Sequence, residues 1–221
     1  MIKIENVKIN GFEEAIHSIR AFNHSLEDID SYKTFIEDPQ TLETAEYSFV
    51  LGRKDSDIMN CFATCGTTHE NCLKMIDVYV DICAPLYWWR EFCVNDYGAV
   101  TNEYGIMYKF RRKDFDISDF STDHLVDDNT DILSKWIAVL NAYRKKFMDA
   151  VDGEDRRKYW WQIMQLLPAS YNQKRYVKFD YWTLKKLYNL HKTSADDWTD
   201  ICKWIESLPY SYLITGLSKE D

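Results

Sequence analysis

A short segment after Pro168 combines side chains that can read a base with side chains that can neutralise a phosphate. Asn172 and Gln173 are amides, and Lys174 and Arg175 are cations. An amide both donates and accepts hydrogen bonds, whereas an ammonium or guanidinium group pairs with phosphate oxygens. One hypothesis is therefore an extended strand that binds an anionic ligand. The residue types alone favour the simpler interpretation, a solvated edge strand whose lysines keep it from pairing with another chain.

Only one of the two neighbouring cations can face a pocket, because successive side chains of a strand point to opposite sides. We predict that this residue is Arg175, since a guanidinium binds phosphate through two parallel hydrogen bonds and lysine offers a point charge. One face would carry Tyr171, Gln173 and Arg175, and the other Asn172, Lys174 and Tyr176.

Three cysteines and a histidine follow one another at helical steps. Cys61, Cys65, His69 and Cys72 are separated by four, four and three residues. A tetrahedral metal needs ligands that converge from several directions, and Gly66 interrupts any continuous helix here. We therefore predict free thiols and no metal site.

The chain carries no recognised motif for phosphate binding or hydrolysis. It lacks the dinucleotide fingerprint and the P-loop spacing, its five histidines are scattered, and no serine stands in a nucleophile elbow. No catalytic residue is predicted from such motifs. The aromatic clusters 87–89 and 159–161 are predicted to be core, with stacking on a base or flavin ring as the alternative.

Apolar spacing predicts a mixture of strands and helices. The segment 25–46 is acidic and weakly periodic, which favours a surface excursion. Strands are expected at 2–9 and 75–82, with a strand or extended loop at 101–110. Helices are expected to begin at Phe12 and to cover 55–66, 86–92, 130–151, 156–167, 181–191 and 196–207.

Composition bounds the class of protein. The chain has 221 residues, 46% hydrophobic, with a formal charge of -9, so we expect one domain over residues 1–221 with a sizeable core. The negative charge disfavours duplex nucleic acid and anionic membranes as partners. No secretory signal or run of about 18 apolar residues occurs, so a cytoplasmic protein with reduced thiols is expected.

Two stretches together resemble the flavin-dependent thymidylate synthases, which make dTMP from dUMP with FAD and methylenetetrahydrofolate. The first is 84–92, APLYWWREF, followed by 99–108, AVTNEYGIMY. The family has a similar proline-led helix and then the signature Arg-His-Arg-x-x-Ser-x-Asn-Glu-x-Ser-x-Arg-Tyr. The second runs from Leu167-Pro168 through 184, then 187–191 and Trp198, and is similar to the family's leucine-proline strand and the two helices after it.

The resemblance implies an α+β fold, a mostly antiparallel sheet packed by helices, that binds a dUMP-like nucleotide and FAD. It also implies a homo-oligomer, a tetramer in the family, with the pocket between subunits and the apolar face of helix 130–151 as a candidate contact. The matched nucleotide-binding positions are Arg90, Asn102, Glu103 and Tyr108, to which the segment discussed above adds Asn172, Gln173, Lys174 and Arg175. The matched flavin-binding positions are Asn189 and His191.

The chain departs from the family signature where cations would hold phosphate and flavin. Asn95-Asp96-Tyr97 stands for Arg-His-Arg, and Val100, Gly105 and Met107 stand for the two serines and the later arginine. Trp182 replaces a nucleotide-binding arginine, and His191 a flavin-contacting one. Two functions are therefore expected: a divergent member that binds dUMP or an altered nucleotide, or a phage-encoded protein that sequesters a nucleotide without catalysis. Methyl transfer of the synthase type stays open.

Overall fold

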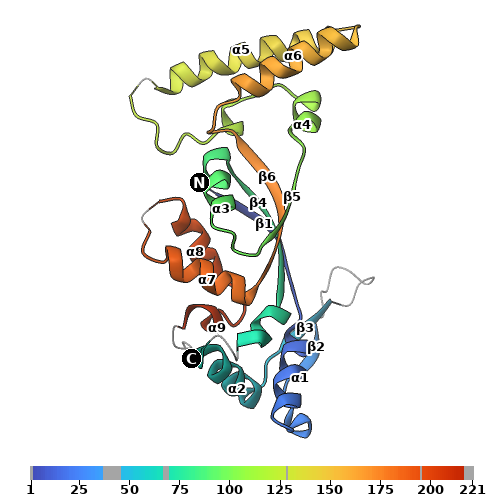
Figure 1. Ribbon diagram of the computed structural model, residues 1–221, viewed down its shortest axis with the longest axis vertical. Coiled ribbons are helices and arrows are strands. Elements are labelled where there is room, and N and C mark those ends of the chain that lie inside the picture. Colours follow the sequence, from blue (N-terminus) through green and yellow to red (C-terminus); the bar gives the residue numbers. More distant parts are fainter. Residues whose placement is uncertain (1, 37–45, 67–69, 128, 195, 217–221) are drawn as a thin grey trace. The chain divides into compact units, whose positions relative to one another are not determined.

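The computed structural model describes residues 2–36, 46–66, 70–127, 129–194 and 196–216 (Figure 1). The chain has the predicted α+β architecture, with helices packed on a mostly antiparallel sheet. The strands are β1 (Lys3–Asn10), β2 (Tyr32–Ile36), β3 (Glu46–Val50), β4 (Asp77–Pro85), β5 (Val100–Glu103) and β6 (Asn172–Asp180). The α-helices are α1 (Phe12–Phe22), α2 (Arg53–Thr64), α3 (Leu86–Val94), α4 (Ile106–Arg112), α5 (Asn129–Asp149), α6 (Gly153–Leu166), α7 (Tyr181–His191), α8 (Trp198–Glu206) and α9 (Tyr212–Thr215).

The main sheet has four strands in the order β1-β4-β6-β5. Along the central strand β4, Val78, Val80 and Ile82 are completely buried, whereas Asp77 and Tyr79 are half-buried. Alternation of this kind indicates a sheet with one face packed against the core. The edge strands β1 and β5 are mostly exposed, which explains their more polar sequences.

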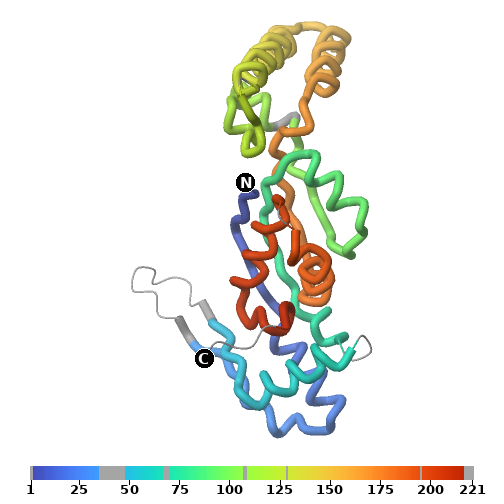
Figure 2. The backbone as a smooth tube through the Cα atoms, turned by 90° about the vertical axis from the view of Figure 1, so that its left-hand side faces the viewer, coloured from blue at the N-terminus to red at the C-terminus, as the bar shows by residue number. Residues whose placement is uncertain are grey.

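The chain divides into two compact units, described separately below. The first contains residues 1–5, 80–96 and 101–177, and the second contains 6–79, 97–100 and 178–221. All four strands of the main sheet contribute residues to both units, and Figure 2 traces the backbone by residue number. A single domain over residues 1–221 stays a prediction.

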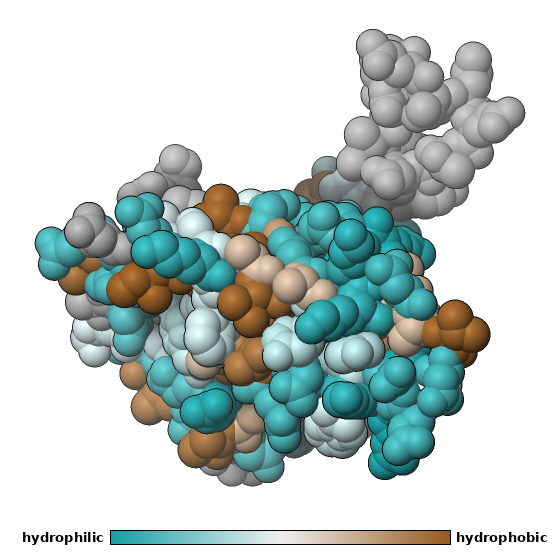
Figure 3. Space-filling model, turned by 90° about the horizontal axis from the view of Figure 1, so that it is seen from above, coloured by the Kyte–Doolittle hydropathy of each residue, from teal (hydrophilic) through white to brown (hydrophobic). Residues whose placement is uncertain are grey.

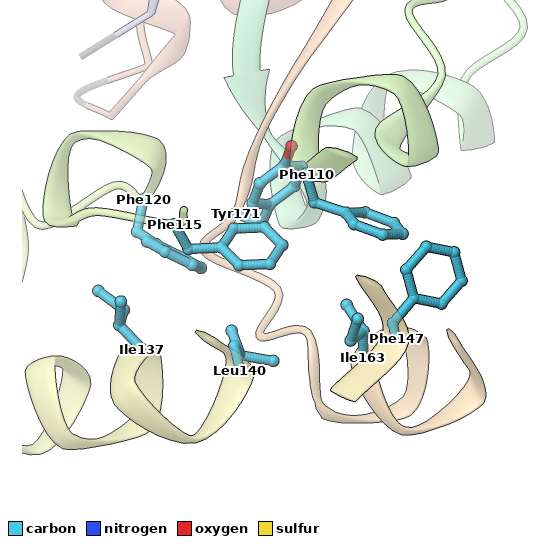
Figure 4. Packing of buried hydrophobic residues seen from close by; sticks show 8 residues of the cluster. All are labelled: Phe110, Phe115, Phe120, Ile137, Leu140, Phe147, Ile163 and Tyr171. Atoms are coloured by element: carbon cyan, nitrogen blue, oxygen red, sulfur yellow. The ribbon is translucent and has the colours of Figure 1, made fainter. Parts of the chain in front are cut away.

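The core of the first unit lies where α4, α5, α6 and the start of β6 meet. Figure 4 shows the rings of Phe110, Phe115, Phe120 and Tyr171 gathered above the aliphatic side chains of α5 and α6, with the Phe147 ring of α5 near Ile163. Phe115 and Phe120 both contact the ring of Tyr171 edge-on, with ring centroids 6.0 and 5.7 Å apart. The cluster consists of Phe110, Phe115, Phe120, Ile137, Leu140, Phe147, Ile163 and Tyr171.

The core of the second unit includes the helices that flank the β1–α1 turn. Phe12 packs edge-on against Tyr181 and Tyr210, at 5.5 and 5.2 Å between ring centroids. A buried ion pair joins α1 to α2, since Arg20 Nη2 lies 2.7 Å from Asp55 Oδ1. The same carboxylate accepts hydrogen bonds from the backbone N–H groups of residues 30 and 31, so it ties that loop to α2.

The segment 25–46 is not only a surface excursion as predicted. It contains the 3₁₀-turn Leu26–Asp28, strand β2 and the first residue of β3. Strands β2 and β3 pair antiparallel, from Tyr32 opposite Val50 to Ile36 opposite Glu46. The two short strands show no clear apolar alternation, so the sequence pattern alone did not indicate this pairing.

Three further expectations need correction. The region 101–110 is divided between the short strand β5 and helix α4. Helix α6 begins at Gly153, three residues before the predicted start, because the Asp152 side chain accepts a hydrogen bond from the Glu154 N–H and caps it. In the aromatic cluster 159–161, Trp161 is 45% exposed, so this cluster is only partly core.

Helix α5 buries the apolar face that was predicted to contact another subunit. Ile137, Leu140 and Phe147 belong to the core of the first unit. Other apolar side chains of α5 remain exposed, and Figure 3 shows brown apolar surface between hydrophilic side chains on the end that carries α5 and α6.

Among the described residues, no helix is both long and apolar enough to cross a membrane.

Candidate functional site

Arg175 lies on the inner face of β6, as the alternation predicted. Its exposed fraction is 9%, and Gln173 on the same face is 4% exposed. The Nε and Nη2 atoms of Arg175 donate to Gln173 Oε1 at 3.0 and 2.8 Å. Nη2 also lies 2.8 Å from Glu103 Oε1. The interpretation of Arg175 as a purely solvated edge residue is therefore wrong.

Helix α3 supplies the surface on which this guanidinium rests. The Arg175 Cζ atom lies 4.5 Å from the centre of the Trp89 ring, a cation–π contact. Trp89 is itself fixed, because its Nε1–H donates to the Gln173 carbonyl at 2.9 Å. The Cys93 Sγ atom accepts from Arg175 Nη1 at 3.6 Å. The strand and the helix thus hold one cation in a defined orientation.

Glu103 is the outermost partner of this group, which we call the Arg175 cluster: Trp89, Cys93, Glu103, Gln173 and Arg175. Its side chain is 53% exposed, compared with 11% for Arg175. Gln173 Nε2 donates to the second Glu103 oxygen at 3.2 Å. The carboxylate therefore occupies, near solvent, a position in which an anionic group of a ligand could receive the same hydrogen bonds.

Lys174 lies on the opposite face of β6 in a separate group of charges. Its Nζ atom is 2.9 Å from Glu5 Oε2 and 3.1 Å from Asp81 Oδ2. The hydrogen bond with Glu5 is the main cause that raises the pKa of Lys174 above its usual range. Tyr104 donates to the other oxygen of Asp81 at 3.1 Å, and this bond raises the pKa of the tyrosine hydroxyl. Lys174 is thus neutralised by two carboxylates.

The remaining predicted nucleotide residues of the first unit are more exposed. Arg90 is exposed on α3, Asn102 is exposed on the edge strand β5, and Asn172 is half-buried on the Lys174 face. Tyr108 belongs to α4, and its side chain lies outside the described residues. Within the described residues, the structure brings together Glu103, Gln173 and Arg175 out of the eight predicted.

His191, which the resemblance matches to a flavin contact, is joined in the second unit to Tyr97, which stands within the altered Arg-His-Arg signature. The Tyr97 hydroxyl and His191 Nε2 are 2.6 Å apart, and both side chains are buried. The His191 ring also stacks on Trp198, with centroids 3.7 Å apart and planes 10° apart. Asn189 is exposed on α7, two residues before His191, and accepts a hydrogen bond from Lys192 at 3.1 Å.

These residues do not fit a clamp for flavin of the kind that the resemblance implies. Such a clamp would present arginine side chains to the cofactor. Here the Tyr97 hydroxyl and His191 Nε2 are instead hydrogen-bonded to each other in a buried contact. Neither group carries the fixed positive charge of a guanidinium.

Trp182 fills the position of a nucleotide-binding arginine with an aromatic ring. Its Nε1–H donates to Glu70 Oε2 at 2.9 Å. The ammonium groups of Lys74 and Lys186 lie 4.4 and 3.9 Å from the ring centre. Positive charge therefore remains near this position, although it is supplied by lysines of η2 (Glu70–Met75) and α7.

The cysteines are free thiols, as predicted. Cys61 and Cys65 are exposed near the end of α2, and Cys72 is buried. His69 lies outside the described residues, so its place relative to them is not described.

Sequence reasoning missed Trp89 and Cys93 as members of the Arg175 cluster, and Asp81 and Tyr104 as partners of Lys174. A signal for α3 was present, because Trp89 and Cys93 are four residues apart and so lie on one side of a helix. No pattern in the sequence shows which strand that side covers.

The fold is similar to solved structures of flavin-dependent thymidylate synthase from Helicobacter pylori, both described as containing FAD and dUMP. One structure has a TM-score of 0.64 and 13% identity, with 97% of this chain and 97% of that chain covered. A second has a TM-score of 0.63 and 14% identity, with coverage of 97% and 100%. No family model and no curated protein sequence matches the chain. The likeness establishes the fold.

Proposed function

We propose that this protein binds a nucleotide of the dUMP class on a scaffold like that of the flavin-dependent thymidylate synthases. The observation that supports the proposal most strongly is the Arg175 cluster, in which a guanidinium is held in place beside an exposed carboxylate. The similar structures are described as binding dUMP, and their fold covers nearly the whole of this chain.

In this proposal the phosphate of the nucleotide replaces Glu103 on Arg175. The contacts given above engage four of the five N–H groups of a guanidinium. Displacement of Glu103 would release one of them, and Gln173 Nε2 would lose its carboxylate partner at the same time. A phosphate could accept from both groups, and Gln173 would still orient the guanidinium.

We also propose Asn102 and Asn172 as polar contacts to the base or ribose, and Arg90 as a second cation for phosphate. Asn102 and Arg90 are exposed, so a ligand can reach them. Tyr108, Asn189 and His191 stay predictions that rest on the resemblance alone, as does FAD as cofactor. The substrate of a reaction, if the chain catalyses one, would be the same nucleotide.

The test is titration calorimetry of the purified protein with dUMP, with and without FAD. Binding of dUMP without FAD supports the proposal, and loss of visible flavin colour on gel filtration would show that no flavin is retained. The enzymatic version requires repeated turnover of dUMP with reductant and methylenetetrahydrofolate. The sequestering version requires that unmodified nucleotide be recovered after heat denaturation. Failure to bind dUMP or a related pyrimidine nucleotide contradicts both versions.

A further inference from the structure

Two thiols at the end of α2 face each other outside the proposed nucleotide site. The Sγ atoms of Cys61 and Cys65 are 3.6 Å apart, and both side chains are exposed. All six cysteines of the chain are described, and none forms a disulfide. The pair belongs to the second unit, whereas Arg175 and its partners belong to the first.

The backbone spacing of the two cysteines is compatible with a covalent bond between them. Residues four apart on an α-helix have Cα atoms about 6.2 Å apart, from 1.5 Å rise and 100° rotation per residue. Disulfides form at Cα separations of about 4.4–6.8 Å, with sulfur atoms about 2.05 Å apart. The two sulfur atoms, now 3.6 Å apart, need to approach by about 1.5 Å. The Cβ atoms must also close from the roughly 5–6 Å of a regular helix to about 3.5–4.5 Å, so the last turn has to adjust.

The end of the helix can accommodate that approach. Cys65 is the C-cap residue of α2, and its N–H donates to the Cys61 carbonyl at 3.0 Å as the last bond of the helix. Gly66 follows with φ of 101°, and no described atom lies within 4 Å of where its Cβ would be. A small adjustment of the last turn thus meets no packed neighbour at this glycine.

The other cysteines differ from this pair in exposure or in partners. Burial raises the pKa of Cys72 to about 11, and burial also raises the pKa of Cys83 and of Cys202. Cys93 is exposed, but its sulfur accepts a hydrogen bond from Arg175. Accessible and mutually facing thiols therefore occur at Cys61 and Cys65.

We propose that Cys61 and Cys65 are a redox-active dithiol that hydrogen peroxide converts into an intramolecular disulfide. The Cys61 thiolate attacks one peroxide oxygen, so that an S–O bond forms, the O–O bond breaks and the leaving hydroxide is protonated to water. Cys65 loses its proton and attacks the sulfenic sulfur, so that the S–S bond forms and the S–O bond breaks with loss of a second water. In total, two thiols lose two electrons and two protons, and one peroxide becomes two waters.

The proximity of the thiols gives the reaction a pH dependence. The hydrogen bond between the two thiols raises the pKa of Cys65, and repulsion from a Cys61 thiolate adds to this. The thiolate is the attacking species. Disulfide formation should therefore accelerate as the pH rises, because more of each thiol is present as thiolate.

Differential alkylation with mass spectrometry tests the proposal on the whole protein. Trypsin releases residues 55–74, which contain Cys61, Cys65 and Cys72. In the reduced protein, iodoacetamide should label the first two in the native state, and N-ethylmaleimide should label Cys72 after unfolding. After one equivalent of peroxide, the peptide should carry no iodoacetamide label and still carry one N-ethylmaleimide. Its mass should be that of the dithiol form less two hydrogens. Dithiothreitol should restore the first pattern.

Cys93→Ser is the matched control, since it removes an exposed thiol and should leave the disulfide unchanged. Cys61→Ser should abolish the loss of two hydrogens and leave Cys65 open to alkylation or to sulfinic acid. The wild-type measurement alone decides the question, even if a variant folds poorly. Persistent alkylation of both thiols after peroxide, separate sulfinic acids, or a disulfide that consumes Cys72 would overturn the proposal.

Discussion

Arg175 is a nearly buried cation whose partners come from two strands and a helix. A buried charge is costly unless it is paired and hydrogen-bonded, and here Gln173, Glu103 and the Trp89 ring serve as partners. The arrangement fixes the fork of the guanidinium, which matters more for binding phosphate than charge alone. Lys174 is less suited to bind a ligand, because two carboxylates already hold its ammonium group.

We predict that Arg175→Lys weakens dUMP binding by at least about tenfold. The substitution keeps the charge but removes the guanidinium bond to the phosphate and the bonds to Gln173 that orient it. Charge-assisted bonds contribute roughly 1.5–3 kcal/mol each, against about 1.4 kcal/mol per tenfold in affinity. Lys174→Ala is the matched control and should stay within about twofold of the parent. Calorimetry measures both affinities, and thermal melting checks that each variant folds. The reverse pattern, with loss only for Lys174→Ala, would contradict the assignment.

A second residue-scale prediction concerns Asp116, which caps the 3₁₀-turn Ile117–Asp119. Its carboxylate accepts from the Ser118 N–H at 2.8 Å and from the Ser118 hydroxyl. These two bonds, and a third hydrogen bond from Lys113, lower the pKa of Asp116 to about 2. A lowered folded-state pKa means that the carboxylate stabilises the fold above about pH 4 and loses this effect as the pH falls towards 2. Asp116→Ala should cost roughly 0.5–2 kcal/mol at pH 7. Urea unfolding of both proteins should show a difference that shrinks near pH 2.5, and an equal difference at both pH values would count against it.

Which residues form the site could be predicted only in part from the sequence. Alternation along β6 correctly placed Gln173 and Arg175 together, because period two is a local property of a strand. The Tyr97–His191 contact joins residues 94 positions apart, and nothing local in either segment indicates it. Asp81 of β4 is only 4% exposed, and Lys174 and Tyr104 satisfy its carboxylate. No local pattern around Asp81 indicates these two partners.

At the scale of elements, strong periodicity or a clear end signal made the prediction accurate. Helix α7 has the predicted bounds, since Asp180 accepts from the Thr183 N–H and caps its start. The hairpin of β2 and β3 was missed because its strands are five residues each and separated by a long acidic stretch. Short strands of this kind depend on pairing with a partner that local sequence does not reveal.

The turn from β1 to α1 gives an element-scale prediction at Gly11. This glycine has φ of 99°, and a Cβ there would lie 1.8 Å from the Met75 carbonyl oxygen. Gly11→Ala should therefore destabilise the protein by more than the roughly 1–3 kcal/mol of backbone strain alone. Gly153→Ala, at the first residue of α6 with open space around it, should be neutral or stabilising by up to about 1 kcal/mol. Chemical denaturation measures both, and equal effects of the two substitutions would refute the argument.

At the scale of the whole molecule, the negative charge and the exposed apolar side chains favour association with another protein surface over nucleic acid. Net charge of -9 opposes binding to duplex DNA. On α5, Ile132, Trp136 and Val139 follow at steps of four and three, so they form one stripe, and they are 61%, 40% and 41% exposed. Apolar side chains that gather on one face of a soluble protein commonly mark an interaction surface. The neighbouring face of α5, with Leu140 and Phe147, lies in the core of its own unit, so this exposed stripe is where we expect the homo-oligomer contact that the resemblance implies.

The double variant Ile132→Lys/Val139→Lys should therefore dissociate the oligomer, with a dissociation constant raised at least about tenfold. Burying two ammonium groups without partners at a contact costs more than the 1.4 kcal/mol that a tenfold change requires. Ser134→Lys is the matched control, because it places a lysine on an exposed position of the same helix away from the stripe and should leave assembly unchanged. Light scattering coupled to gel filtration measures the mass, and circular dichroism checks that α5 still forms. A wild-type protein that is monomeric at working concentration, or a control that dissociates as readily as the double variant, would exclude the stripe as the contact.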